Sequence, residues 1–169
     1  INEISEDIGV SKFHFIRIFK NYVGVTPKQF LHSINLNYAK KYLKNSKSIL
    51  DSSLEIGLSS TSRLHELFVT LEGVTPKEWK EKGKNVLINY GYGQTPFGEA
   101  LIGITEKGIC FLEFIDENKN DIFNRFIKLW ENANLQFNEV IANEYLKNIF
   151  SENKRYPLLV KGTNLQINV

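Results

Sequence analysis

The residues best suited to chemistry lie on one predicted helix near the start of the chain. Over residues 12–23, two apolar and two cationic side chains recur at helical spacing and would share one face: Phe13, Ile16, Arg17 and Lys20. Such a face suits the major groove of DNA, where apolar atoms contact thymine methyl groups and arginine binds guanine edges or phosphates. The alternative is that Phe13 and Ile16 pack against a neighbouring helix.

Residues for covalent or metal chemistry are scarce. Cys110 is the only cysteine, and its place within a predicted strand favours a small buried side chain over a nucleophile. The YGYG run (90–93) lacks the pattern of a phosphate-binding loop. Three carboxylates at strand ends are more typical of solvated groups than of a metal site: Glu99, Glu113 and Asp116. The histidines are far apart in sequence and have no cysteine partners: His14, His32 and His65. We therefore expect no catalytic residue, no metal and no cofactor in this chain.

The positive charge is concentrated in one early block. The net charge is only +2, yet residues 8–50 contain eight Lys or Arg and no Asp or Glu. Residues 51–82 contain four basic and six acidic residues, and residues 84–169 contain nine and ten. A basic block of this kind is typical of proteins that bind a polyanion such as nucleic acid, and a solvated helix face is the alternative.

A short segment occurs twice in the first half of the chain. GVTPKQF (24–30) returns as GVTPKEW (73–79), and each copy follows an Ile-Gly-aliphatic-Ser segment and a helical run. An internal repeat of this kind indicates one structural unit used twice. Within each copy, Gly is suited to end one helix and Pro to begin the next. Each unit is therefore predicted to be a helix-turn-helix.

The two units are expected at residues 1–25 and 48–75, joined by a long helix over 27–44. In the first unit, Ser11 should cap a helix with the buried stripe Phe15, Phe19 and Tyr22. The first helix of the second unit should bury Ile49, Leu50, Leu54 and Ile56. Its second helix should bury Leu64, Leu67, Phe68 and Leu71, and it should present Ser62, Arg63, His65 and Glu66 outward.

These faces define the expected DNA contacts: Ser11, Lys12, Phe13, Ile16, Arg17, Lys20, Lys40, Lys41, Thr61, Ser62, Arg63 and His65. Lys40 and Lys41 are assigned to phosphates, which every DNA sequence offers alike. The first unit holds the basic block and should supply most of the affinity. The second unit carries Glu66 and should bind weakly or contact RNA polymerase instead.

The second half of the chain, residues 84–169, has the pattern of an α+β domain with helices on a mostly antiparallel sheet. The expected strands are 86–92, 99–105, 109–114, 135–137 and 157–162. The expected helices are 121–132 and 139–150.

Two helix-turn-helix units on one long helix, each closing on Gly-x-Thr-Pro with an aromatic residue three positions later, resemble the AraC family of transcription regulators. The resemblance covers residues 1–82 and implies double-stranded DNA as the partner. In that family the two recognition helices enter successive major grooves, about 34 Å apart.

Residues 90–114 of the second half, YGYGQTPFGEALIGITEKGICFLEF, resemble the Ada-type regulators. In these proteins an AraC-type half is fused to a methylated-DNA–protein-cysteine methyltransferase. The resemblance implies a multidomain protein: an all-α double helix-turn-helix domain, then the ribonuclease-H-like N-terminal subdomain of that enzyme at 84–169. It also implies a regulator of the alkylation response whose full-length form transfers a methyl group from 6-O-methylguanine to its own cysteine. The acceptor segment Pro-Cys-His-Arg does not occur here, so this chain is expected to be inactive as a methyltransferase.

Two alternatives for the second half stay open. It could sense a small-molecule effector in a pocket lined by Tyr90, Tyr92, Trp130 and Tyr145, or it could be a magnesium-dependent nuclease. No apolar run is long enough to cross a membrane, so no membrane contact is expected. The single cysteine and the lack of a signal peptide fit a cytoplasmic, nucleoid-associated protein.

Overall fold

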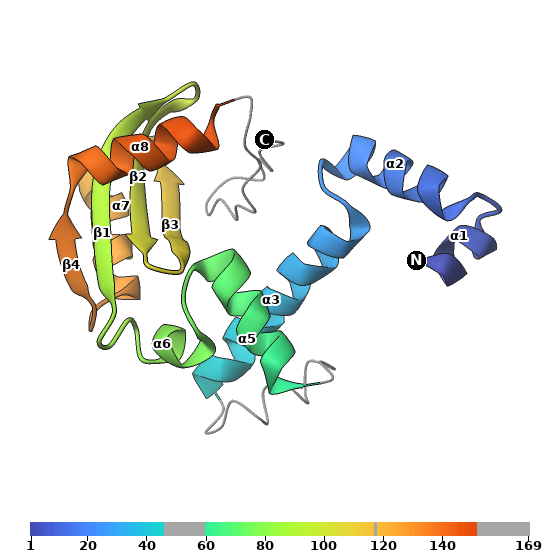
Figure 1. The fold of residues 1–169 in the computed structure, drawn as a ribbon, viewed down its shortest axis with the longest axis horizontal. Coiled ribbons are helices and arrows are strands. Elements are labelled where there is room, and N and C mark those ends of the chain that lie inside the picture. Colours follow the sequence, from blue (N-terminus) through green and yellow to red (C-terminus); the bar gives the residue numbers. More distant parts are fainter. Residues whose placement is uncertain (46–59, 117, 152–169) are drawn as a thin grey trace.

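The computed structural model describes residues 1–45, 60–116 and 118–151. A helical region comes first in the chain, and a sheet flanked by two helices follows (Figure 1). The helical region comprises α1 (Asn2–Asp7), α2 (Lys12–Val23), α3 (Pro27–Asn45), α5 (Thr61–Glu72) and α6 (Pro76–Lys80). The second region comprises β1 (Leu87–Thr95), β2 (Gly98–Thr105), β3 (Gly108–Phe114), α7 (Lys119–Leu129), β4 (Asn134–Phe137) and α8 (Glu139–Ile149). Two predictions lie outside the described residues: the helix with Ile49, Leu50, Leu54 and Ile56, and the strand at 157–162.

The repeated segment builds the same local structure twice. In each copy a glycine in the left-handed region ends a helix, Gly24 at φ +86° and Gly73 at φ +60°. Thr26 and Gln29 then exchange hydrogen bonds between side chain and backbone amide, at 2.9 and 3.3 Å. Thr75 forms the corresponding pair with the glutamate three residues later, at 2.7 and 3.2 Å. These reciprocal caps satisfy free amides at the start of α3 and α6, which explains why the seven letters recur.

The first unit is thinly packed. Ser11 caps α2 as predicted, its hydroxyl accepting the amide hydrogen of His14 at 3.3 Å, yet α2 contains no buried residue. Phe15 and Phe19 are half-buried, with ring centroids 5.9 Å apart. Tyr22 departs from the predicted stripe because its side chain is 89% exposed. Helical spacing placed it on the stripe, but no described element covers that end of α2.

The second unit has a closed core. Leu64, Leu67 and Phe68 of α5 are buried as predicted, whereas Leu71 is only half-buried. Leu36, Ala39 and Leu43 of α3 are fully buried and belong to the same cluster of side chains. The long helix α3 therefore anchors its C-terminal half in the second unit.

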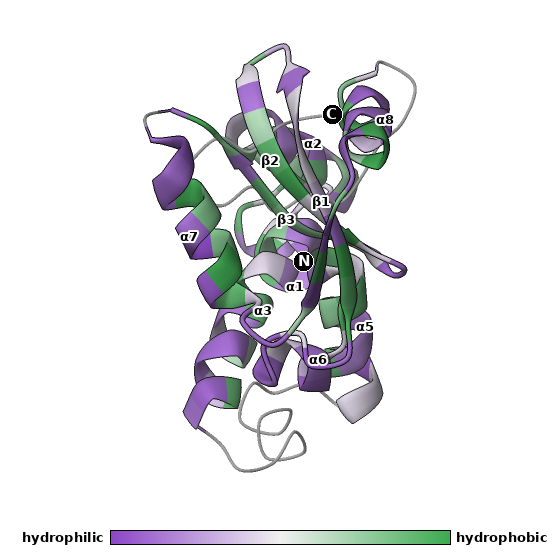
Figure 2. Ribbon diagram, turned by 90° about the vertical axis from the view of Figure 1, so that its left-hand side faces the viewer, coloured by the Kyte–Doolittle hydropathy of each residue, from purple (hydrophilic) through white to green (hydrophobic). Residues whose placement is uncertain are grey.

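The sheet has the strand order β3-β2-β1-β4. The first three strands form an antiparallel meander, and β4 returns parallel to β1 after the crossover through α7. Helices α7 and α8 lie on opposite sides of this sheet (Figures 1 and 2). The predicted α+β arrangement is thus present as a mixed sheet with a helix on each face.

The YGYG run lies within β1, in agreement with the prediction that it is not a phosphate-binding loop. Its tyrosines belong to the cluster that includes α7, and its glycines face α8. A Cβ at Gly91 would lie 2.7 Å from Cβ of Ala142, and one at Gly93 would lie 2.6 Å from Cδ1 of Leu146. Glycine is required here because α8 lies too close to the strand for any side chain.

Candidate nucleic-acid interface

The predicted reading face of α2 is open to solvent. Phe13 is 83% exposed, which argues against the alternative that it packs on a neighbouring helix among the described residues. Three cations on the same helix are also exposed: Lys12, Arg17 and Lys20. Ile16 is the half-buried member of the predicted reading face. A protruding aromatic ring surrounded by cations can place apolar atoms and hydrogen-bond donors in a DNA groove together.

Arg17 is positioned by a residue that the sequence analysis did not assign to the interface. Its Nη2 lies 2.9 Å from Nδ1 of His14, one helical turn earlier. The imidazole accepts this hydrogen bond when its own proton is on Nε2. The signal in the sequence was the spacing of three residues between His14 and Arg17, which sets two helical side chains side by side.

The reading face of α5 is confined to its N-terminal half. Ser60 caps the helix by accepting the amide hydrogen of Arg63, and four predicted contact residues are exposed: Thr61, Ser62, Arg63 and His65. At its other end, Glu72 and Gly73 are buried. In helix-turn-helix proteins the N-terminal residues of the second helix contact the base edges. The exposed N-terminal end of α5 is therefore the end suited to base contacts.

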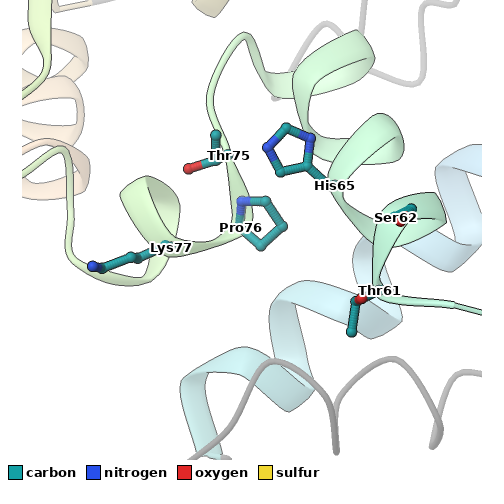
Figure 3. A pocket seen from close by; sticks show the side chains of 6 residues that line it. All are labelled: Thr61, Ser62, His65, Thr75, Pro76 and Lys77. Atoms are coloured by element: carbon teal, nitrogen blue, oxygen red, sulfur yellow. The ribbon is translucent and has the colours of Figure 1, made fainter.

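A hollow of about 480 Å³ lies between the starts of α5 and α6. His65 projects from α5 toward Pro76 there, whereas Lys77 points away from the hollow (Figure 3). The lining residues are Thr61, Ser62, His65, Thr75, Pro76 and Lys77. The last three come from the repeated segment, which the sequence analysis treated as structural only. Three predicted contacts thus meet the start of α6, which extends the predicted contact surface of the second unit.

Lys40 and Lys41 differ in the exposure of their side chains, although both were predicted to contact phosphates. Lys41 is exposed, as a phosphate contact requires. Lys40 instead forms an ion pair with Glu72, whose side chain is 3% exposed, and its ammonium lies 5.7 Å from the Trp79 ring centroid. Lys40 is therefore half-buried against Glu72 and Trp79, which makes it less suited to a phosphate contact than Lys41.

The carboxylates considered for a metal are not assembled into a site. Glu99 pairs with Lys119 at 2.7 Å, and Glu113 pairs with Arg125. Within residues 1–45, 60–116 and 118–151, no group of three or more His, Cys, Asp or Glu side chains is placed to hold a metal ion. Among the same residues, no helix is long and apolar enough to span a membrane.

The aromatic residues considered for an effector pocket lie on different faces of the sheet. Tyr90 and Tyr92 belong to the cluster with α7, and Trp130 is fully buried there. Tyr145 belongs to the cluster on the α8 side. These four side chains therefore do not line one cavity.

The comparisons with known proteins cover both regions of the chain. Residues 4–82 match the family described as a helix-turn-helix domain. The chain is similar to the bifunctional transcriptional activator/DNA repair enzyme Ada of Escherichia coli, with 22% identity across 100% of this chain and 49% of that protein. It is 25% identical to the regulatory protein Ada of Salmonella typhimurium across 63% of this chain and 30% of that protein. It is also 25% identical to an uncharacterized HTH-type transcriptional regulator of Staphylococcus aureus, across 99% of this chain and 23% of that protein.

The chain spans about half the length of the first relative and less of the other two. No solved structure matches it. The family match covers the two predicted reading helices and the helix α3 between them. Residues 4–82 of this chain therefore carry a helix-turn-helix domain similar to those of AraC-type transcription regulators.

Proposed function

We propose that this chain is the DNA-binding part of a regulator of the response to DNA alkylation, linked in its full-length form to a methyl-transferring repair enzyme. One observation carries the proposal. A helix-turn-helix domain and a mixed four-stranded sheet follow each other in one chain, and both align with a protein named as activator and DNA repair enzyme.

In this proposal two recognition helices read one side of a DNA duplex. The helix α3 between the units has 19 residues and spans about 28 Å. Adjacent major grooves on one side of B-DNA recur about every 34 Å, so a helix of this length suits two successive grooves. Arg17 and Phe13 supply base contacts in the first groove, and Arg63 with His65 supplies them in the second. Lys41 contributes sequence-independent affinity at a phosphate.

The sheet domain is proposed to be the ribonuclease-H-like subdomain of the repair enzyme. A three-stranded meander followed by a helix and a fourth strand parallel to the first is consistent with the start of that fold. Cys110 lies on β3 and is 4% exposed, so it is not placed to accept a methyl group from DNA. Methyl transfer is assigned to residues that this chain does not contain. RNA polymerase as a second partner and a place in the cytoplasm belong to the same proposal.

A second candidate is a regulator whose sheet domain binds a small effector. Nearly the whole chain is also similar to a transcriptional regulator that is not named as a repair enzyme, which leaves room for this candidate. The dispersed aromatic residues count against the pocket first considered for it.

Two assays on one preparation test the proposal. Duplexes selected from a random library are titrated with the chain at several salt concentrations, and methyl uptake from 6-O-methylguanine duplex is measured in parallel. The expected result is specific binding that weakens steeply with salt, without methyl uptake. A matched control is Lys128→Ala, an exposed lysine on α7 far from the reading faces, which should bind as the wild type does. Methyl transfer to Cys110 or the absence of DNA binding would overturn the assignment.

A further inference from the structure

The helical and sheet regions share one core. Buried side chains of α3, α5, β1, β3 and α7 form a single cluster that includes Leu43, Phe68, Ile88, Phe111 and Phe126. Interfaces between domains are usually more polar than a core and allow relative motion. An apolar core that runs through both regions instead favours a rigid connection.

A close contact joins the end of α5 to the turn between β2 and β3. A Cβ at Gly73 would lie 2.7 Å from both the carbonyl carbon and the oxygen of Gly108. The carbonyl of Gly73 also accepts a hydrogen bond from the hydroxyl of Thr105, and this bond is buried. The carbonyl groups at the end of a helix lack partners within it, and here the sheet region supplies one.

A second link lies beside the first. Lys107 of the same turn donates a hydrogen bond at 3.1 Å to Glu78, which also caps α6 through Thr75. Burial alone would raise the pKa of Glu78, but hydrogen bonds from Thr75 and Lys107 outweigh it and lower that pKa. The turn therefore holds the end of α5 and the start of α6 together.

The first unit has no comparable anchor among the described residues. Helix α2 contacts α1 and α3 and contains no buried residue. Among the described residues, its connection to the second unit runs through helix α3 (Figure 1).

We propose that the sheet domain positions the second recognition helix, so that α5 and the sheet move as one body while the first unit adjusts to the DNA. This inference rests on the proposed DNA binding by α5. Thr105, Lys107 and Gly108 are positioning residues for that helix: they hold its buried C-terminal end while its N-terminal half meets the groove. A change in the sheet domain would then alter recognition at the second half-site and leave the first half-site unaffected.

The first test uses DNA footprints of the whole chain. Arg17→Ala and Arg63→Ala first identify which half-site each unit protects. Thr105→Val should then weaken protection of the second half-site by about three- to tenfold and leave the first unchanged, a typical size for coupling through a packed network. Thr105→Ser retains the hydroxyl and should restore wild-type protection. Equal loss at both half-sites, or no loss in a folded Thr105→Val protein, would overturn the proposal.

The second test measures rigidity directly and does not depend on DNA binding. The protein carries Cys110→Ala, so that only the introduced cysteines react with the spin label. Labels at Thr70→Cys and Glu144→Cys report the distance between α5 and α8. Labels at Asn21→Cys and Glu144→Cys report the distance between α2 and α8. All three labelled positions are exposed. The expected result is one narrow distance distribution for the first pair and a broad one for the second, which narrows with the selected duplex. A broad distribution for the first pair would refute the rigid joint. A narrow one without any DNA binding would support the joint and refute the proposed function instead.

Discussion

Lys40 of α3 and Glu72 of α5 form an ion pair in which the carboxylate is 3% exposed. Removing one partner of a buried pair leaves the other charge without compensation, at a typical cost of about 3–5 kcal/mol. The side chain of Lys40 is 14% exposed, so water can partly solvate Glu72 when Lys40 is removed. We therefore expect a cost at the lower end of this range. The pair therefore stabilises the contact of α3 with α5.

The first prediction separates two adjacent lysines. Lys40→Ala should lower the free energy of unfolding by about 3 kcal/mol and leave the salt dependence of DNA binding unchanged. Lys41→Ala should leave stability within about 0.5 kcal/mol of the wild type and reduce the salt slope by about one unit, because it removes a phosphate contact. Urea unfolding and binding titrations measure the two effects.

A double variant serves as the control for the same pair. Lys40→Met with Glu72→Leu removes both charges and should recover most of the stability lost in Lys40→Ala. If Lys40→Ala instead flattened the salt slope as Lys41→Ala does, Lys40 would be a DNA contact after all.

The second prediction concerns the reading face of α2. Arg17→Ala and Phe13→Ala should each weaken specific binding by about 1–3 kcal/mol, the usual value of a base contact. His14→Ala should have a smaller effect, because it removes only the group that positions Arg17. The matched control is Tyr22→Ala, since Tyr22 is similarly exposed but lies on the opposite side of the helix. If Tyr22→Ala and Phe13→Ala had equal affinity for the selected duplex, the predicted face of α2 would not be the one that reads DNA.

Much of the fold follows from local signals. The caps at Ser11, Thr26 and Thr75 act within one helical turn, and so the ends of α2, α3 and α6 could be predicted from neighbouring residues. The strands likewise carry their own turn and alternation signals, and all four described strands were predicted.

Contacts between distant segments could not be predicted in this way. An exposed lysine and a paired lysine look alike in a sequence, and the partner of Lys40 lies 32 residues away. Gly73 was read only as the end of a helix, whereas its contact with Gly108 joins two regions of the protein. Tyr22 fits the helical stripe, yet burial requires a covering element that periodicity cannot supply.

The third prediction tests the close approach of α8 to β1. Gly91→Ala should destabilise the protein by about 1–3 kcal/mol, because its new methyl group would lie 2.7 Å from Cβ of Ala142. Ala142→Gly removes that methyl group and should cost about 1 kcal/mol as a glycine within a helix. The double variant should be less destabilised than the sum of the two, which is the sign expected of direct contact. Strict additivity in thermal unfolding would indicate that α8 does not approach the strand this closely.

The fourth prediction is the pH dependence of the link between Glu78 and Lys107. The pKa of Glu78 is lowered from 4.5, so its contribution to stability is full above that value and is lost as pH falls through the lowered pKa. The pKa of Lys107 is raised from 10.5 by hydrogen bonds to Glu106 and Glu78, so its contribution is full below that value and is lost as pH rises through the raised pKa.

Glu78→Gln should therefore unfold at lower urea concentration than the wild type at neutral pH and approach it in acid below pH 4.5. The difference should stay below about 1 kcal/mol, because both side chains are about a quarter exposed and water screens the pair. Glu106→Gln is the control, because Glu106 also pairs with Lys107 but its side chain is 82% exposed. The two variants should differ most in the footprint of the second half-site, where Glu78→Gln weakens protection and Glu106→Gln does not. The same loss in both variants would assign the effect to the charge of Lys107 rather than to its link across the joint.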